Sequence, residues 1–141
     1  MSIQSLLSNK NILSSIAPTP KDIVLTISPN YSTEVFGSIA PSILYNGSTI
    51  TGDLVNLTFQ VFVRQFNFSD KPALLFLLPD NISTLNINGM CLIELLPSKN
   101  TSFGIGQVRS GIEIAFQNVN NINLGTSPAT LYFNISFTNN Y

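Results

Sequence analysis

Hydrophobic and polar residues alternate along two segments of the chain, 55–63 and 131–137. In the first segment one side carries only apolar residues, which are Val55, Leu57, Phe59, Val61 and Val63. In the second segment the matching side is formed by Leu131, Phe133, Ile135 and Phe137. Successive side chains of a β-strand point to opposite faces, so this period of two predicts strands with one face in the core and the other outside.

Shorter apolar runs fill most of the remaining chain after residue 20. We expect further strands at 23–27, 34–39, 42–45, 48–51, 73–78, 85–87, 90–96, 103–109 and 112–116. Hairpin turns are expected between neighbouring runs at Asn46-Gly47, Asn88-Gly89 and Ser110-Gly111, because Asn and Gly tolerate positive φ. Residues 117–128 are expected to form a loop with at most one weak strand around Ile122. Many short strands with tight turns predict an all-β fold, an antiparallel β-sandwich or single jelly roll.

The first twenty residues follow a different pattern and are interpreted as an N-terminal arm outside the domain of residues 21–141. Ile3, Leu6 and Leu7 lie at helical spacing, whereas Pro18 and Pro20 favour an extended linker. Two interpretations of the arm stay open. It is either a disordered tail or an anchor whose apolar residues Ile3, Leu6 and Leu7 bind a neighbouring subunit.

The composition of the chain argues against nucleic-acid binding and against insertion into a membrane. Only 9% of the residues are charged and the net charge is −1, with no run of Lys or Arg, so we expect no nucleic-acid binding. No apolar stretch reaches 18 residues, and Met1 to Leu7 lack the features of a secretory signal. We therefore expect no membrane insertion and synthesis without a signal peptide. The single cysteine, Cys91, lies in an apolar run and is expected to be buried and inert.

The chain offers little for catalysis or for cofactors. It contains no His, which is the commonest general base and the commonest metal ligand. A glycosidase-like pair of Glu94 and Glu113 is the one acid–base arrangement to consider, and no acids cluster closely enough for a calcium site. Gly104-Ile105-Gly106 lacks the third glycine and the following helix of a phosphate loop, so we interpret it as a source of backbone freedom in a strand. We expect no enzyme activity, no cofactor and no metal.

The apolar content exceeds what one sandwich interior needs. Residues 74–78 and 91–96 are largely apolar on both faces of their strands, and Phe62 and Tyr132 fall on the outward face of the two alternating strands. Either loops or the arm cover this surface, or it meets another molecule. We favour assembly with copies of the same chain, with Phe62 and Tyr132 at the oligomer interface.

The order of strands and turns resembles small viral jelly-roll structural proteins over about two-thirds of the chain, residues 52–141. The features that carry this resemblance are the strand 55–63, a strand that ends in Leu78-Pro79, the Asn88-Gly89 turn, the turn and strand at 110–114, and the closing strand 131–137. Proteins of this kind include the vertex (penton) proteins of tailless icosahedral DNA viruses and the trimeric heads of phage fibres.

The resemblance implies a virion protein on the capsid surface that forms a trimer or pentamer and reaches other capsid proteins through its arm. The absence of a basic arm departs from capsid proteins that bind the genome. One alternative function is a trimeric fibre head that binds a host receptor or glycan. A sugar-binding sandwich is the other, with Tyr31, Tyr45, Phe66 and Phe68 as candidate contacts.

Overall fold

The structure is a computed structural model that describes residues 18–109, 112–120 and 128–140. Nearly all of its regular structure is strand. The elements are β1 (Lys21–Asp22), β2 (Thr26–Ile27), α2 (Thr33–Phe36), β3 (Ser42–Asn46), β4 (Thr49–Thr51), β5 (Leu54–Val63), β6 (Ala73–Leu77), β7 (Ile87–Leu95), β8 (Thr101–Arg109), β9 (Glu113–Gln117) and β10 (Ala129–Thr138). Every pairing between these strands is antiparallel, as the sequence predicts.

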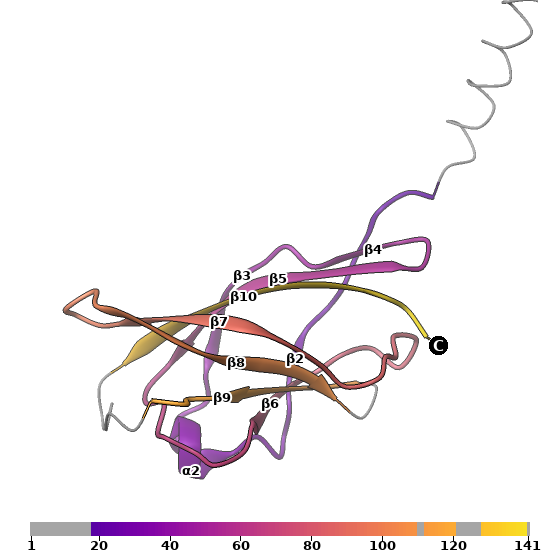
Figure 1. Cartoon of the computed structure of the whole chain (residues 1–141). Helices are drawn as coiled ribbons and strands as arrows, with labels where there is room; N and C mark the ends of the chain where they lie inside the picture. The colour runs from indigo at the N-terminus through magenta and orange to yellow at the C-terminus, as the bar shows by residue number, and fades with distance from the viewer. Residues whose placement is uncertain (1–17, 110–111, 121–127, 141) are drawn as a thin grey trace, which may run out of the picture.

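The strands form one curled sheet in the order β1-β4-β5-β10-β7-β8-β9-β6-β2, and β3 pairs beside β4 on the edge of β5. In Figure 1, β4, β5 and β10 lie above, β6 and β9 lie below, and β7 and β8 carry the sheet from one layer to the other. Residues 21–27 join the two ends of the sheet, because β1 pairs with β4 and β2 pairs with β6. The result is the predicted antiparallel sandwich.

The connections follow two Greek keys. When β1 with β2 and β3 with β4 are each taken as one strand, the first key has the order β6, β1/β2, β3/β4, β5, and the second has the order β10, β7, β8, β9. In each key the fourth strand returns beside the first. Eight strands in two Greek keys are the general plan of a jelly roll.

The segment predicted as a strand at 34–39 is instead the single helical turn α2. Ser32 precedes the turn, and its Oγ accepts a hydrogen bond from the Val35 amide at 3.4 Å. A helical turn buries the consecutive residues Val35 and Phe36 together, which an alternating strand cannot do. The Phe36 ring stacks on Phe66 at 5.4 Å, so tertiary packing decides the local structure here.

The predicted hairpin turn at Asn46-Gly47 is also wrong. Both β3 and β4 pair with β5, and the residues between them form an irregularity along one edge. The Asn46 side chain donates to the Ile23 carbonyl at 2.8 Å and accepts from the Ser48 amide at 3.0 Å, which holds the chain in line. The true hairpin turn follows at Gly52 and Asp53, where Gly52 has φ +59°.

The predicted hairpin turn at Asn88-Gly89 is wrong as well. Both residues lie inside β7 and pair with Gln107 and Gly106 of β8. The Asn88 Oδ1 accepts a hydrogen bond from Gln107 Nε2 at 2.9 Å. Ser110-Gly111 and Ile122 lie outside the described residues, although Arg109 pairs with Glu113 across the predicted β8–β9 hairpin.

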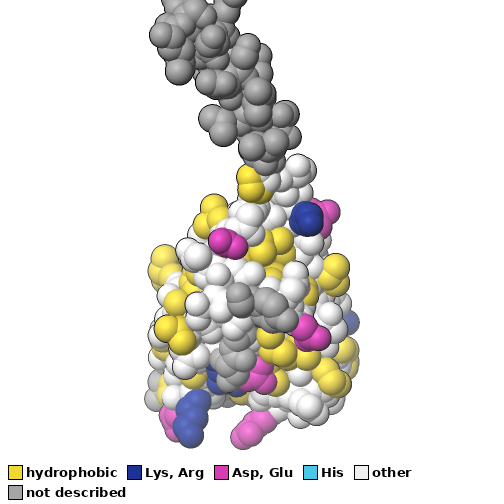
Figure 2. Space-filling model, turned by 90° about the vertical axis from the view of Figure 1, so that its right-hand side faces the viewer, with side chains coloured by type: hydrophobic (Ala, Val, Ile, Leu, Met, Phe, Trp, Pro, Cys, Tyr) yellow, Lys and Arg dark blue, Asp and Glu magenta, His cyan; other side chains and the backbone are white. Residues whose placement is uncertain are grey.

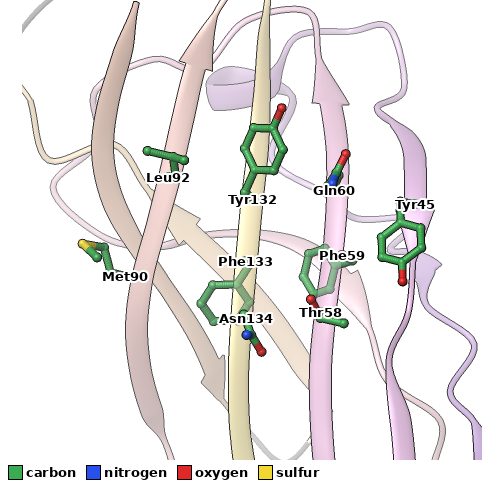
Figure 3. Close-up of a pocket in the computed structure, with 9 residues that line it drawn as sticks. All are labelled: Tyr45, Thr58, Phe59, Gln60, Met90, Leu92, Tyr132, Phe133 and Asn134. Carbon is green, nitrogen blue, oxygen red and sulfur yellow. The ribbon is translucent and has the colours of Figure 1, made fainter.

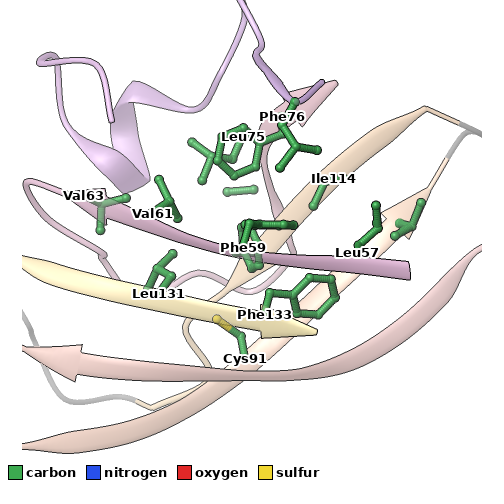
Figure 4. Close-up of a cluster of buried hydrophobic side chains, with 14 of the residues drawn as sticks. Leu57, Phe59, Val61, Val63, Leu75, Phe76, Cys91, Ile114, Leu131 and Phe133 are labelled. Carbon is green, nitrogen blue, oxygen red and sulfur yellow. The ribbon is translucent and has the colours of Figure 1, made fainter. Parts of the chain in front are cut away.

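Aromatic rings fill the centre of the sandwich (Figure 4). Phe59 makes edge-on contacts with Phe76 and Phe116, and its ring centre lies 5.7 Å from that of Phe133. The apolar sides of 55–63 and 131–137 face this core, as predicted, with Ile135 partly buried at its margin.

Among the described residues, no helix has the length and apolar character needed to cross a bilayer.

Candidate functional site: the outer face of the sheet

Five neighbouring strands, β3, β5, β10, β7 and β8, turn one side away from the core. We call this side the outer face. Its central row runs across all five strands in register, since Tyr45 pairs with Gln60, Gln60 with Tyr132, Tyr132 with Leu92, and Leu92 with Phe103. Strand alternation explains the arrangement, because the residues on either side of each of these positions in β5, β10 and β7 are the buried ones.

The apolar side chains of the outer face are unusually exposed on its β7–β8 half. Met90 is 68% exposed and Phe103 is 52% exposed, and with Ile105, Val119 and two glycines they line a shallow, mostly apolar depression. Figure 2, which views a different side of the molecule, shows apolar side chains among uncharged polar ones and separate charged ones.

The structure places both predicted interface residues on the outer face. Phe62 pairs with Thr130, two residues from Tyr132 on the same strand. The two side chains are only partly exposed. The Arg64 guanidinium lies 5.3 Å from the Phe62 ring centre, so Phe62 is partly covered by a cation–π contact.

Tyr132 is fixed by a neighbour across the strand pair. Its hydroxyl donates a hydrogen bond to Glu94 Oε1 at 3.3 Å. Partial burial raises the pKa of Tyr132, and the negative charge and hydrogen bond of Glu94 raise it further. Tyr132 therefore stays neutral and keeps its ring at a set place on the outer face.

Sequence reasoning missed the two most exposed apolar residues of this face in β7 and β8, Met90 and Phe103. Met90 begins the run 90–96, which the sequence presents as apolar on both faces of its strand. Phe103 begins the run 103–109, which the sequence presents as an ordinary strand. The only signal available was that Met90 and Leu92 alternate with the buried Cys91 and Ile93. The arm residues Ile3, Leu6 and Leu7 lie outside the described residues, so their predicted role in partner binding stays a prediction.

The structure keeps the two candidate catalytic carboxylates apart. Glu94 pairs with Thr101, whereas Glu113 pairs with Arg109 and forms an ion pair with it at 3.6 Å. Thr101 and Arg109 are eight positions apart along β8, which is about 27 Å of strand. The two carboxyl groups of a glycosidase lie about 5 to 10 Å apart, so this pair does not have that geometry.

Other chemistry is sparse in the part of the chain that the structure describes. No three His, Cys, Asp or Glu residues gather there as a metal site. Cys91 is fully buried, as predicted, and burial raises the pKa of its thiol to about 12 against a smaller lowering effect of the Tyr132 backbone. Gly104 and Gly106 leave room for neighbouring groups, because a Cβ on Gly106 would lie 2.6 Å from Cδ1 of Phe133.

The four aromatic residues considered for sugar binding do not form one site. Phe66 is buried against Phe36, and the Tyr31 hydroxyl donates to the Gly37 carbonyl at 3.2 Å. Phe68 is exposed in the loop after β5, and Tyr45 lies on the outer face. Only Tyr45 belongs to the surface described above.

Comparison of this chain with protein-family models, with curated proteins and with solved structures finds no match.

Proposed function

We propose that this chain is a non-enzymatic structural protein of a virus particle, a small jelly-roll subunit that forms a homo-oligomer on the capsid surface. The observation that carries the proposal is the outer face, where apolar side chains lie in register across neighbouring strands and remain exposed in a single copy. Exposed apolar surface of this kind marks sites of association in soluble proteins.

The β7–β8 half of the outer face is the best candidate for the contact between copies. Met90, Leu92, Phe103 and Ile105 occupy adjacent outward positions there, and Tyr132 lies at the border. Burying a large apolar side chain contributes about 1.5–3 kcal/mol, whereas association costs about 4–15 kcal/mol in lost freedom. Several buried apolar side chains from each copy are therefore needed to offset the cost of association, and the β7–β8 half supplies them.

The place where the N-terminal segment joins the domain supports two separate roles. The outer face would contact neighbouring copies, and the N-terminal segment would attach the subunit to other capsid proteins. Pro18 lies against the β4–β5 turn, 3.4 Å from where a Cβ on Gly52 would be. Asn139, which follows β10, donates its amide to the Asp53 carbonyl at 2.6 Å, so both ends of the domain leave at the same end of the strands (Figure 1). An arm attached there would start at the end of the strands beside Gly52 and not on the outer face.

The proposal is tested by charge substitution on the outer face. We expect Phe103→Asp to shift sedimenting material from oligomer to monomer, because a carboxylate in the contact would be desolvated without a partner. Leu85→Asp is the matched control, since Leu85 is 77% exposed but lies outside the outer face. Equal sedimentation of both variants and the parent chain as monomers would contradict the proposal. A trimer would favour the fibre-head alternative over a five-fold vertex.

A further inference from the structure

A shallow hollow lies on the outer face and extends from Tyr45 in β3 to Met90 and Leu92 in β7. Its volume is about 380 Å³, which is within the range of small-ligand sites, about 300 to 1,000 Å³. No charged residue lines it. The lining residues are Tyr45, Thr58, Phe59, Gln60, Met90, Leu92, Tyr132, Phe133 and Asn134 (Figure 3).

The strand register places two tyrosines on either side of an amide. Tyr45 and Tyr132 both pair with Gln60, one from each neighbouring strand, while Thr58 and Asn134 form the adjacent pair. Neighbouring strands are about 4.8 Å apart, so the backbones that carry the two tyrosines are separated by about 10 Å. The hollow is therefore a polar floor between two phenol rings.

The polar groups of this floor are available to a ligand. Within the described part of the chain, the Thr58 hydroxyl, the Gln60 amide, the Asn134 amide and the Tyr45 hydroxyl make no hydrogen bond to protein. Polar side chains just outside the hollow behave differently, since Ser136 donates to Asn56 at 3.0 Å. Together the free groups offer both donors and acceptors.

The Tyr45 ring is 54% exposed, and its phenol end lies beside Gly47. A Cβ added at Gly47 would lie 2.9 Å from the Tyr45 Cζ. The exposed part of the ring is open to a ligand.

We propose that this hollow binds a neutral sugar ring. An aromatic face is electron-rich and packs against the C–H face of a pyranose, while amides and hydroxyls match the donor and acceptor character of sugar hydroxyls. The absence of a cation in the lining and the Glu94 carboxylate that borders Tyr132 disfavour an acidic sugar. This binding activity is proposed in addition to assembly, and the hollow shares Met90, Leu92 and Tyr132 with the proposed contact between copies.

The same chemistry is offered by a free oligosaccharide, a glycoprotein glycan or a polysaccharide, so the test uses simple probes. The probes are the methyl glycosides of glucose, galactose, mannose and N-acetylglucosamine, with methyl glucuronide as the acidic comparison. Saturation-transfer NMR on the full chain should detect at least one neutral glycoside at millimolar concentration. The acidic glycoside should bind more weakly than glucose.

Substitutions of the residues that line the hollow test whether the glycoside binds there. Gln60→Ala and Asn134→Ala should each weaken the bound glycoside about tenfold, equivalent to about 1.4 kcal/mol. Tyr45→Ala should abolish binding, whereas Tyr45→Phe should retain the stacking and most of the affinity. Asn56→Ala is the matched control, because Asn56 lies on the same side of β5 but outside the hollow.

Three results would overturn the sugar site. One is that none of the neutral glycosides binds the full chain. Another is that Asn56→Ala weakens binding as much as Gln60→Ala does, with both variants folded by circular dichroism. The last is that Gln60→Ala or Asn134→Ala dissociates the oligomer, which would make the hollow part of the contact between copies and would support assembly instead.

Discussion

Two glycines in neighbouring strands make room for the ring of Phe133. Gly89 of β7 and Gly106 of β8 are a cross-strand pair, and the Phe133 ring lies over both. This arrangement explains why an Asn-Gly pair, which ordinarily favours a turn, continues here as strand. The ring belongs to a residue more than forty positions away from Gly89, so local sequence carries no sign of it.

At Gly106 we predict a steric effect from one methyl group. Gly106→Ala should lower the free energy of unfolding by about 1–3 kcal/mol, because the new Cβ would lie 2.6 Å from the Phe133 Cδ1. Gly89→Ala should cost less, since its Cβ would lie 3.2 Å from the nearest ring atom. Chemical denaturation measures both.

A second substitution shows whether the ring is the cause. Adding Phe133→Leu to Gly106→Ala should destabilise less than the sum of the single changes, since the smaller side chain relieves the overlap. If the losses of unfolding free energy from the two single changes simply add, the effect of Gly106→Ala does not come from contact with the Phe133 ring.

The buried thiol of Cys91 should make stability depend on alkaline pH. Burial raises its pKa to about 12 in the folded chain, whereas an unfolded cysteine titrates near about 8.5. Between these values the unfolded chain releases a proton that the folded chain keeps, so the folded state loses stability as pH rises, by at most about 1.4 kcal/mol per pH unit. Cys91→Ala should flatten the curve of unfolding free energy against pH in this window. Parallel curves for the two proteins would contradict the burial of the thiol.

At the scale of elements, the alternation of apolar and polar residues predicted a strand correctly where one face of the strand is buried and the other is exposed to solvent. It predicted β5 and β10 closely, because their inward and outward residues differ in polarity. It failed for α2, where the Phe36–Phe66 stack decides the conformation. It also could not reveal Met90 and Phe103 as exposed, since their exposure depends on which strands pair and on what covers the sheet.

The β4–β5 hairpin depends on the left-handed conformation of Gly52, with φ +59°. Gly52→Ala should cost about 1–2 kcal/mol, because a Cβ is unfavourable at this φ. Gly52→Asn should cost less, since Asn tolerates that conformation. Thermal melts of the three proteins measure the difference. Equal losses from Ala and Asn would indicate that contact with Pro18, not backbone strain, limits this position.

At the scale of the whole molecule, the domain separates three surfaces. The N-terminal segment and the last strand leave at one end, beside the β4–β5 turn. The β7–β8 half of the outer face is apolar, and the neutral hollow extends from β3 to the border of this half at Met90, Leu92 and Tyr132. The sequence predicts lateral contact from its surplus of apolar residues and attachment from the arm residues Ile3, Leu6 and Leu7, and both stay predictions.

Native mass spectrometry of the full chain tests the central claim of assembly most directly. We expect a dominant species at three or five times the chain mass of 15.4 kDa, with loss of that species in Phe103→Asp and its retention in Leu85→Asp. A single species at the mass of one chain, unchanged as the protein concentration is raised, would contradict it.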